Sequence, residues 1–332
     1  MLRTLLKWTA IVVGSALLLL AAAVVFLSIK KPAQRPASAA RFEATPARLA
    51  RGKYVVEALA DCMGCHSDRD YTRWGAPVVE ARRGVGGAAF NEANSGVPGV
   101  VCAQNITSDR ATGLGAWTDG EIARAIREGV DRHGDALFPM MPYAYYHAMS
   151  DEDVEAVVVY LRTLPPIANA VPPKHIKFPV SLFVKSAPAP IEGPVATPND
   201  ATDHLAYGKY LVTVGGCREC HTAHDDHGQL VPGRDFAGGW KLTGPWGTVV
   251  TANITPDAAT FVGSATKEQF IARFKAFASM TAENAPKTKG DTTIMPWMAM
   301  SRLTEQDLGA MYDYLRTVAP IHNVVTSFPG PG

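Results

Sequence analysis

The sequence has almost no net charge and no long run of like charges. Its 32 lysines and arginines nearly balance 31 aspartates and glutamates, so the formal net charge at pH 7 is +1. Proteins that hold nucleic acid by its phosphates usually present a basic surface, and charged interaction tails appear as blocks of one sign. The composition therefore argues against a nucleic-acid partner and against an acidic or basic tail.

Cysteine is scarce, with five in 332 residues, yet four of the five form two copies of one pattern, Cys-x-x-Cys-His. Two thiols one helical turn apart can both reach the vinyl groups on one edge of a porphyrin, and the adjacent histidine can bind the iron as its proximal ligand. The pattern predicts two covalently bound haems c. The copies are Cys62, Cys65 and His66, and Cys217, Cys220 and His221.

Three other uses of these cysteines fit the pattern less well. A thioredoxin-like thiol pair does not need the histidine and belongs near a βαβ pattern, which the sequence does not show. A zinc site is possible around the second copy, because His224 and His227 follow it, but the first copy has no such followers. A disulfide at this spacing, formed twice, leaves both histidines unexplained.

The second half of the chain repeats the first, which predicts two copies of one domain. Residues 151–169 align without gaps on residues 305–323, and nine of the nineteen positions are identical. Gly-Lys-Tyr precedes both cysteine motifs, and Asn-Ile-Thr occurs once in each half, beginning at Asn105 and at Asn253.

The repeat also selects distal haem ligands. Met141 and Met295 occupy matching positions, and a proline follows each of them. A thioether favours reduced iron and so raises the reduction potential, and the proline stiffens the loop that aims the sulfur. The neighbouring methionines have no methionine opposite them in the other copy, so we take them for packing residues; they are Met140, Met298 and Met300.

Local signals predict helices in both halves. Thr45-Pro46 can begin a helix that runs up to Cys62. Capping boxes at Thr118 and Thr266 predict two more helices, and apolar spacing predicts a last helix in each half. Nine prolines between Leu164 and Asp200 predict a linker, in which we expect the apolar residues 178–184 to pack on a domain.

The first thirty residues predict a membrane anchor. An apolar run from Trp8 to Ile29 is long enough to span a bilayer, for which roughly 20 residues are needed. The alternative is a long signal peptide cleaved near residues 37–40. Basic residues are more numerous after the run than before it, so the charge count does not favour a cytoplasmic N-terminus.

These motifs resemble the cytochrome c subunits of bacterial membrane-bound alcohol, aldehyde and gluconate dehydrogenases. The resemblance covers about residues 46–325 and rests on both cysteine motifs, both Asn-Ile-Thr segments and the stretches 112–119, 137–143 and 150–153. It implies an inner-membrane protein with a single N-terminal anchor and its haem domains in the periplasm. Those subunits usually carry three such domains, whereas this chain has two.

Together these signals predict an all-α fold of two tandem class I-type cytochrome c domains behind an N-terminal transmembrane helix. The expected segments are the anchor at 1–30, a linker at 31–44, a first domain at 45–168, a proline-rich linker at 169–200 and a second domain at 201–328.

Asn105 and Asn253 are candidate haem-binding residues that could reach a propionate, brace the methionine loop or only cap a turn. Cys102, the fifth cysteine, is either a distal ligand or a small buried residue; its counterpart Val250 favours the second reading.

The function predicted is electron transfer without catalysis. The resemblance implies a periplasmic or membrane-bound dehydrogenase as donor and quinone, another cytochrome or a terminal oxidase as acceptor. The alternative is a dihaem enzyme, such as a peroxidase or a thiosulfate-oxidising enzyme, which needs an open distal face or Cys102 on the iron.

Overall fold

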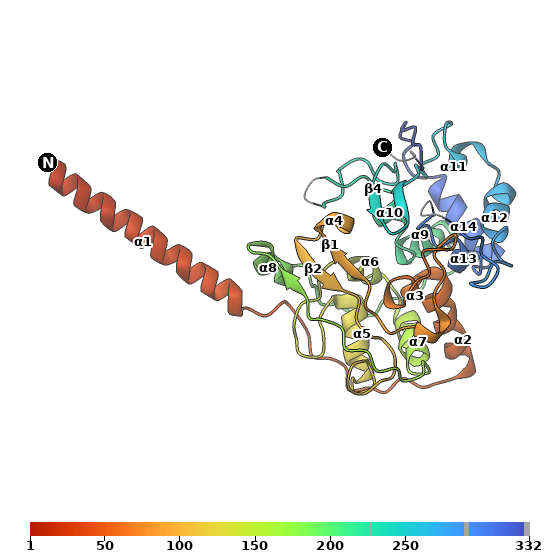
Figure 1. The fold of residues 1–332 in the computed structure, drawn as a ribbon, viewed down its shortest axis with the longest axis horizontal. Helices are drawn as coiled ribbons and strands as arrows, with labels where there is room; N and C mark the ends of the chain where they lie inside the picture. Colours follow the sequence, from red (N-terminus) through yellow and green to blue (C-terminus); the bar gives the residue numbers. More distant parts are fainter. Residues whose placement is uncertain (226–227, 289–291, 329–332) are drawn as a thin grey trace.

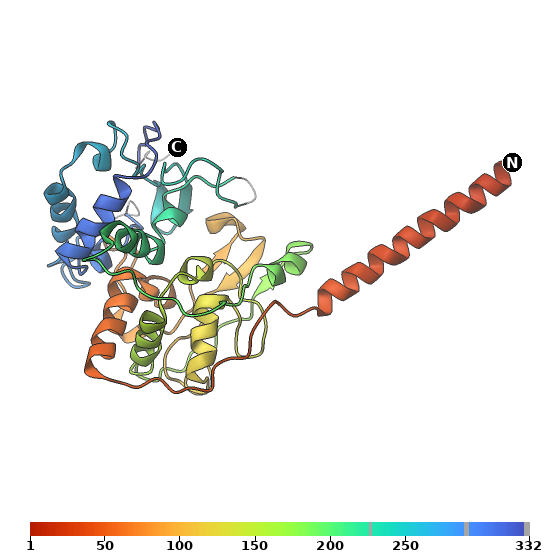
Figure 2. The same cartoon turned by 180° about the vertical axis from the view of Figure 1, so that it is seen from behind.

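The computed structural model describes residues 1–225, 228–288 and 292–328, and its most prominent feature is the long helix α1 (Leu2–Ile29). This helix stands clear of a rounded body that holds the rest of the chain (Figures 1 and 2). None of its residues is buried. Of the helices in the described residues, α1 is the one that is long and apolar enough to cross a membrane.

The predicted linker after α1 lies along the body; we call residues 31–44 the N-terminal strap. Lys31 forms an ion pair with Asp135 at 2.6 Å, and Arg35 forms one with the buried Glu128 at 2.8 Å. A side chain at Gly120 would collide with the strap, because a Cβ atom there would lie 2.1 Å from the carbonyl oxygen of Ser38. The strap therefore ties the end of α1 to the body.

In each repeat the first and last long helices cross in close contact. The first repeat pairs α2 (Pro46–Tyr54) with α7 (Asp151–Leu161), and the second pairs α9 (His204–Val214) with α14 (Glu305–Leu315). A Cβ atom on Gly52 would lie 2.0 Å from the Ala156 carbonyl oxygen, and one on Gly208 would lie 2.1 Å from that of Ala310. Glycine at these matching positions permits the close crossing.

The helix starts predicted from capping residues are confirmed. Thr45 caps α2 through the backbone N–H of Arg48. Thr118 and Glu121 form a capping box at the start of α5 (Asp119–Glu128), and Thr266 and Gln269 form one at α12 (Lys267–Lys275). Each box satisfies two backbone N–H groups that a helix start otherwise leaves unpaired.

The prediction that the first helix continues to Cys62 is wrong. Helix α2 ends at Tyr54, and a π-helical turn, η1 (Val55–Leu59), follows it. Asp61 then adopts a left-handed conformation with φ of 42°, which separates this turn from α3 (Cys62–His66). In the second repeat Gly216, with φ of 64°, has the same place before α10 (Cys217–Cys220). The left-handed residue turns each cysteine motif away from the helix before it.

Helices dominate the structure, but two small sheets make the predicted all-α class too narrow. One sheet is antiparallel, in the order β1 (Ala89–Asn91), β2 (Gly99–Cys102) and β3 (His175–Ile176). The other is the hairpin of β4 (Lys241–Gly244) and β5 (Gly247–Val250). The remaining short helices are η2 (Glu80–Arg82), α4 (Glu92–Ser95), α6 (Tyr143–Tyr146), α8 (Val180–Phe183), η3 (Val184–Ser186), α11 (Phe261–Ser264) and α13 (Trp297–Met300).

Both repeats contribute to one continuous core. Val55, Val56 and Leu59 of the first repeat and Leu211 and Val214 of the second are among its fully buried members. Contacts between the repeats follow a twofold pattern, since α6 packs against α9 and α13 packs against η1. Each methionine loop is therefore followed by a short helix that contacts the other repeat.

Candidate functional site

The two cysteine motifs lie on the short helices α3 and α10. All five cysteines are in the described residues, and each is free. Cys62 and Cys217 are half-buried, whereas Cys65 and Cys220 are exposed. Burial raises the pKa of Cys62 and of Cys217 to about 12. Redox-active cysteine pairs have lowered thiol pKa values, so the structure does not support the thioredoxin-like alternative.

The histidine of each motif donates to a backbone carbonyl. The Nδ1 atom of His66 lies 2.6 Å from the carbonyl oxygen of Gln104, and the Nδ1 atom of His221 lies 2.7 Å from that of Ala252. A hydrogen bond from Nδ1–H leaves Nε2 unprotonated and able to bind a metal. Burial lowers the pKa of both histidines, which favours this neutral form. Free thiols one turn apart and a ring in this tautomer fit covalently attached haem.

The Asn-Ile-Thr segments form the same turn in both repeats. The side-chain oxygen of Asn105 accepts hydrogen bonds from the backbone N–H and the hydroxyl of Thr107 at 2.9 and 2.7 Å. Its side-chain nitrogen donates to the carbonyl of Ile167 at 2.8 Å. Asn253 makes the matching bonds, to Thr255 at 2.9 and 2.8 Å and to the carbonyl of Ile321 at 2.7 Å. Both amides are thus bonded to protein atoms. Each asparagine directly follows the residue whose carbonyl accepts the hydrogen bond from the histidine of the motif.

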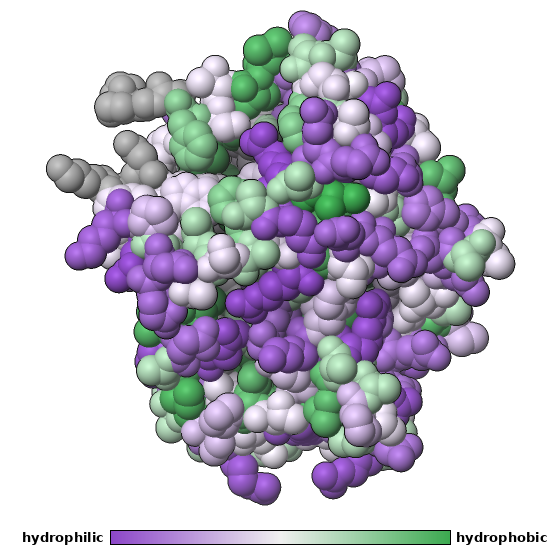
Figure 3. Space-filling model, turned by 90° about the vertical axis from the view of Figure 1, so that its right-hand side faces the viewer, coloured by the Kyte–Doolittle hydropathy of each residue, from purple (hydrophilic) through white to green (hydrophobic). Residues whose placement is uncertain are grey.

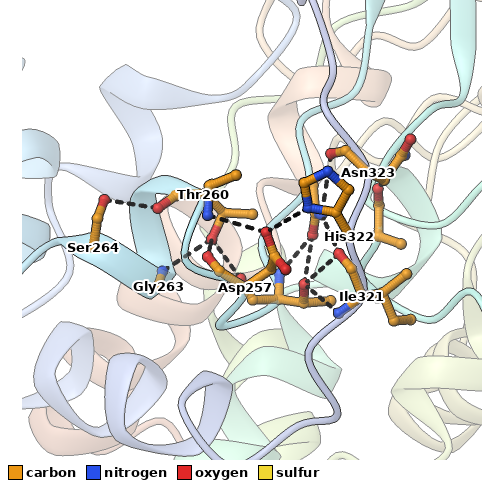
Figure 4. A network of polar contacts seen from close by, with 11 residues as sticks. Asp257, Thr260, Gly263, Ser264, Ile321, His322 and Asn323 are labelled. Carbon is orange, nitrogen blue, oxygen red and sulfur yellow. Dashed lines mark hydrogen bonds and ion pairs between the residues drawn. The ribbon is translucent and has the colours of Figure 1, made fainter.

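The loop after Asn253 is held by further polar contacts (Figure 4). The backbone N–H and hydroxyl of Thr260 donate to the Asp257 carbonyl at 2.9 Å each, and the Thr260 hydroxyl accepts from the N–H of Gly263 at 2.9 Å. The ring of His322 lies 3.2 Å from a carboxylate oxygen of Asp257. This places the segment after α14 against the Asn-Ile-Thr turn.

In each repeat a glycine, which was not predicted from the sequence, donates a backbone hydrogen bond to the histidine of the motif. The backbone N–H of Gly86 donates to the His66 carbonyl at 2.9 Å, and that of Gly238 donates to the His221 carbonyl at 2.7 Å. Both glycines have positive φ values, 73° and 66°, and a Cβ on either would lie 2.4 Å from a backbone oxygen. The Gly-Gly pairs at 86–87 and 238–239 occur at matching positions in the two repeats, and this repetition could have identified the two glycines from the sequence.

An asparagine after the last helix of each repeat fixes the residue before that glycine. Asn169 donates to the carbonyl of Val85 at 2.8 Å, and Asn323 donates to that of Ala237 at 2.7 Å. These asparagines close the sequence alignment of the repeats, but no role was predicted for them. Their matching bonds show that the two repeats also share the hydrogen bonds that hold the segment beside each Cys-x-x-Cys-His motif.

The two candidate methionines have the same backbone setting. Tyr143 donates its backbone N–H to the Met141 carbonyl at 2.8 Å, and Trp297 donates to the Met295 carbonyl at 2.8 Å. The prolines between them have φ/ψ values of −80°/46° and −78°/59°. Both methionines are half-buried at the edge of the core.

Two of the neighbouring methionines are held in other packing positions. Met300 is only 4% exposed and belongs to the core. The terminal methyl of Met298 packs against Gly75 of the first repeat, where a Cβ atom would lie 3.0 Å from it. The structure thus gives both side chains the packing role that the repeat alignment predicted.

The two candidate sites contact each other through side chains on both repeats. The hydroxyl of Tyr145, on α6, donates to the carboxylate of Glu219, on α10, at 2.7 Å. On the other side Trp74 stacks on Phe277 with centroids 4.9 Å apart, and Phe277 lies 5.1 Å from Trp297. Each methionine loop therefore lies next to the motif-bearing region of the other repeat.

The Cys102 alternative loses its support, and the zinc alternative is tested only at His224. His224 stacks on Trp240 at 3.9 Å and lies 3.2 Å from Glu219, while His227 lies outside the described residues. Within the described ranges, no group of three His, Cys, Asp or Glu side chains could hold a metal ion. Cys102 is 8% exposed and ends β2, as Val250 ends β5, so it packs as a small apolar residue.

No protein-family model matches the chain, but several curated proteins are similar to it. It is 32% identical to the cytochrome c subunit of gluconate 2-dehydrogenase from Pantoea cypripedii over 54% of this chain and 39% of that protein. It is 28% identical to the cytochrome c subunit of quinone alcohol dehydrogenase from Gluconacetobacter polyoxogenes over 84% of this chain and 58% of that subunit. A dihaem c-type cytochrome from Cereibacter sphaeroides is 28% identical over 65% of this chain and 70% of its own length. The chain thus spans 39% of the first dehydrogenase subunit and 58% of the second.

Proposed function

We propose that this chain, a homologue of the cytochrome c subunits of bacterial membrane-bound dehydrogenases, transfers electrons through two covalently bound haems c. The observation that carries the proposal is the duplicated motif in which Cys-x-x-Cys presents free thiols and the histidine Nδ1 binds a carbonyl. Bound haem supplies reversible one-electron chemistry, and the protein supplies its orientation and potential. The homologues are electron-transfer components of dehydrogenase complexes, which supports a carrier rather than an enzyme.

In this proposal each repeat forms one cytochrome c domain, at residues 45–168 and 201–328. Four cysteines form the thioether bonds, two histidines are the proximal ligands and two methionines are the distal ligands. The distal assignment is supported by the matching backbone of the two Met-Pro loops and by the packing of Met298 and Met300 elsewhere. The residues are Cys62, Cys65, His66 and Met141 in the first domain, and Cys217, Cys220, His221 and Met295 in the second.

Asn105 and Asn253 belong to the proposed haem sites as positioning residues. Each amide fixes the turn directly after the carbonyl that accepts the Nδ1–H of the proximal histidine. A fixed acceptor holds the imidazole ring in one orientation and in the tautomer that leaves Nε2 free for iron. A direct bond from either amide to haem remains a prediction from the sequence.

The proposed location is the periplasmic face of the bacterial inner membrane. Haem c is attached in the periplasm, so α1 would have its N-terminus in the cytoplasm and the body outside. A dehydrogenase would donate electrons, and quinone, another cytochrome or a terminal oxidase would accept them. The names of the relatives, which include quinone-dependent alcohol dehydrogenase subunits, support this class of partner.

The test is the reactivity of the purified full-length protein. We expect reversible reduction and oxidation of both haems, no change in the reduced spectrum on adding carbon monoxide, and no turnover of peroxide or thiosulfate. These results follow because methionine fills the distal position on both irons. Binding of carbon monoxide to either haem, or turnover of peroxide or thiosulfate, would instead support the dihaem enzyme.

A further inference from the structure

Two large apolar side chains are exposed next to the end of the long helix α1. Phe178 is 68% exposed to solvent, and Phe183 is 61% exposed. They flank and end α8 (Val180–Phe183), in the segment expected to pack on a domain. That expectation is wrong for both phenylalanines, whereas the adjacent Val184 is only 9% exposed and packs inward.

The short helix η3, which directly follows α8, is tied to the C-terminal end of α1. The ammonium group of Lys185 donates to the carbonyls of Leu27 and Ser28 at 3.2 and 2.5 Å, in the last turn of α1. Figure 1 shows α8 beside that end, on the side of the body from which α1 departs. Lys30 and Lys31 follow directly, and such basic residues commonly lie among the lipid headgroups at the end of a spanning helix. The exposed phenylalanines are thus beside the point where α1 would leave the bilayer.

The body holds α8 in this place. The backbone N–H of Lys177, just before α8, donates to the carbonyl of Pro98 at 2.9 Å, and its side chain pairs with Glu92 at 2.8 Å. Strand β3 joins the preceding residues to β2. The N-terminal strap fixes the end of α1 to the same repeat. Both α1 and α8 are therefore attached to the first repeat.

We propose that Phe178 and Phe183 insert into the interfacial layer of the bilayer that α1 spans, so that this surface of the body docks on lipid. Exposed aromatic rings beside the end of a spanning helix suit that layer, because apolar side chains such as phenylalanine can enter the boundary between headgroups and acyl chains. The face of the body turned away from α1 carries hydrophilic side chains mixed with apolar patches (Figure 3). Apolar exposure alone therefore does not single out α8, and its place beside the end of α1 carries the proposal. The inference rests on the membrane anchoring in the proposed function, and not on the haem ligands.

The proposal predicts which positions contact lipid. A photoreactive phenylalanine, benzoylphenylalanine, would replace Phe178 or Phe183 in the full-length protein, reconstituted in phosphatidylcholine–phosphatidylglycerol vesicles. Leu18, in the middle of α1, is the positive control. Lys53 is the negative control, because it is exposed on α2, on the side of the body far from α1 (Figures 1 and 2). Haem content and reversible reduction would be measured on each sample.

We expect lipid adducts at Phe178, Phe183 and Leu18, each several-fold above the level at Lys53, as detected by mass spectrometry of the labelled peptides. Labelling at Leu18 with only the Lys53 level at both phenylalanines would overturn the docking proposal and leave the anchor intact. Adducts with a second copy of the chain, in place of lipid, at both phenylalanines would also overturn it. No labelling at Leu18 would remove the anchor and the docking together, while intact haem reduction would show that the electron-transfer proposal still holds.

Discussion

The hydroxyl of Tyr210 donates a 2.5 Å hydrogen bond to the carboxylate of Asp153, across the boundary between the two repeats. The same hydroxyl accepts the backbone N–H of Ser150 at 3.2 Å. The reciprocal contact joins Tyr54 to the carboxylate of Asp307, and the Tyr54 hydroxyl accepts the N–H of Thr304 at 3.0 Å. The tyrosine of each Gly-Lys-Tyr segment thus bonds the start of the last helix in the other repeat, and this pair of contacts fixes how the two candidate sites face each other.

Tyr210→Phe should destabilise the folded protein by about 1–3 kcal/mol, because it leaves a buried carboxylate and a backbone N–H without this partner. Guanidinium unfolding followed by haem absorbance would measure the loss. Tyr314→Phe is the matched control, since the Tyr314 hydroxyl has no hydrogen-bond partner in the described part of the chain. Equal stability of the two variants would show that the contact across the repeats contributes little.

Met141→Ala and Met295→Ala should each remove about half of the weak red-end absorption band that reports iron–methionine bonding, and should lower the potential of one haem. The loss of a soft neutral ligand disfavours reduced iron. Met140→Ala and Met298→Ala are the controls and should leave the band unchanged. A band that survives both Met141→Ala and Met295→Ala would contradict the distal ligand assignment.

Asn105→Ala should loosen the first proximal histidine, whereas Gln104→Ala should not. The Gln104 backbone carbonyl accepts the hydrogen bond from the Nδ1–H group of His66, and the Gln104 side chain only donates to the Cys102 carbonyl at 2.9 Å. Loss of the buried amide bonds of Asn105 should cost about 1–3 kcal/mol of stability. A redox titration followed by haem absorbance should show a shifted reduction potential for the first haem in Asn105→Ala alone, because the fixed carbonyl orients the ligating imidazole. The same response in Asn105→Ala and Gln104→Ala would mean that the Asn105 turn does not hold His66 through the Gln104 carbonyl.

The stability of the second repeat should fall as the pH rises past the pKa of His204. Hydrogen bonds to Asp313 and Asp200 raise that pKa above its usual value of 6.5, because both ring nitrogens face carboxylates and only the charged ring can donate to both. The stabilisation is therefore complete below pH 6.5 and lost above the raised pKa. The side chain is 41% exposed, so the effect should be below about 1 kcal/mol.

The denaturation midpoint of the wild type should exceed that of His204→Gln at pH 6, and the two should converge at pH 9. His175→Gln is the control, because that exposed ring has no hydrogen bond within the described residues. A difference between wild type and His204→Gln that stays constant over this range would contradict the ionic contribution of His204.

The helix starts and the long helices could be predicted because their signals are local. A capping box such as Thr118 with Glu121 lies within one turn, and the apolar spacing of α7 and α14 marks their buried faces. The homology to dehydrogenase cytochrome c subunits, predicted from the motifs, is confirmed by the similar proteins. Signals within a few residues of each other therefore gave the reliable part of the prediction.

The small sheets and the support of the histidines depend on residues far apart in the chain. Strands of two to four residues, such as His175–Ile176, are too short to show alternation, and β3 joins β2 only through the fold. The π-turn before Cys62 has no pattern that separates it from an α-helix. Asn169 reaches Val85 across more than eighty residues, and a single sequence carries no sign of that contact except the repeat.

The central claim is that both motifs hold covalent haem, and the intact mass of the full-length protein with its pyridine haemochrome spectrum tests it most directly. The account predicts two haems per chain, one after Cys62→Ser/Cys65→Ser, one after Cys217→Ser/Cys220→Ser, and reversible reduction of the haem that remains. A wild-type chain with fewer than two covalent haems, or a cysteine variant that keeps both, would contradict it.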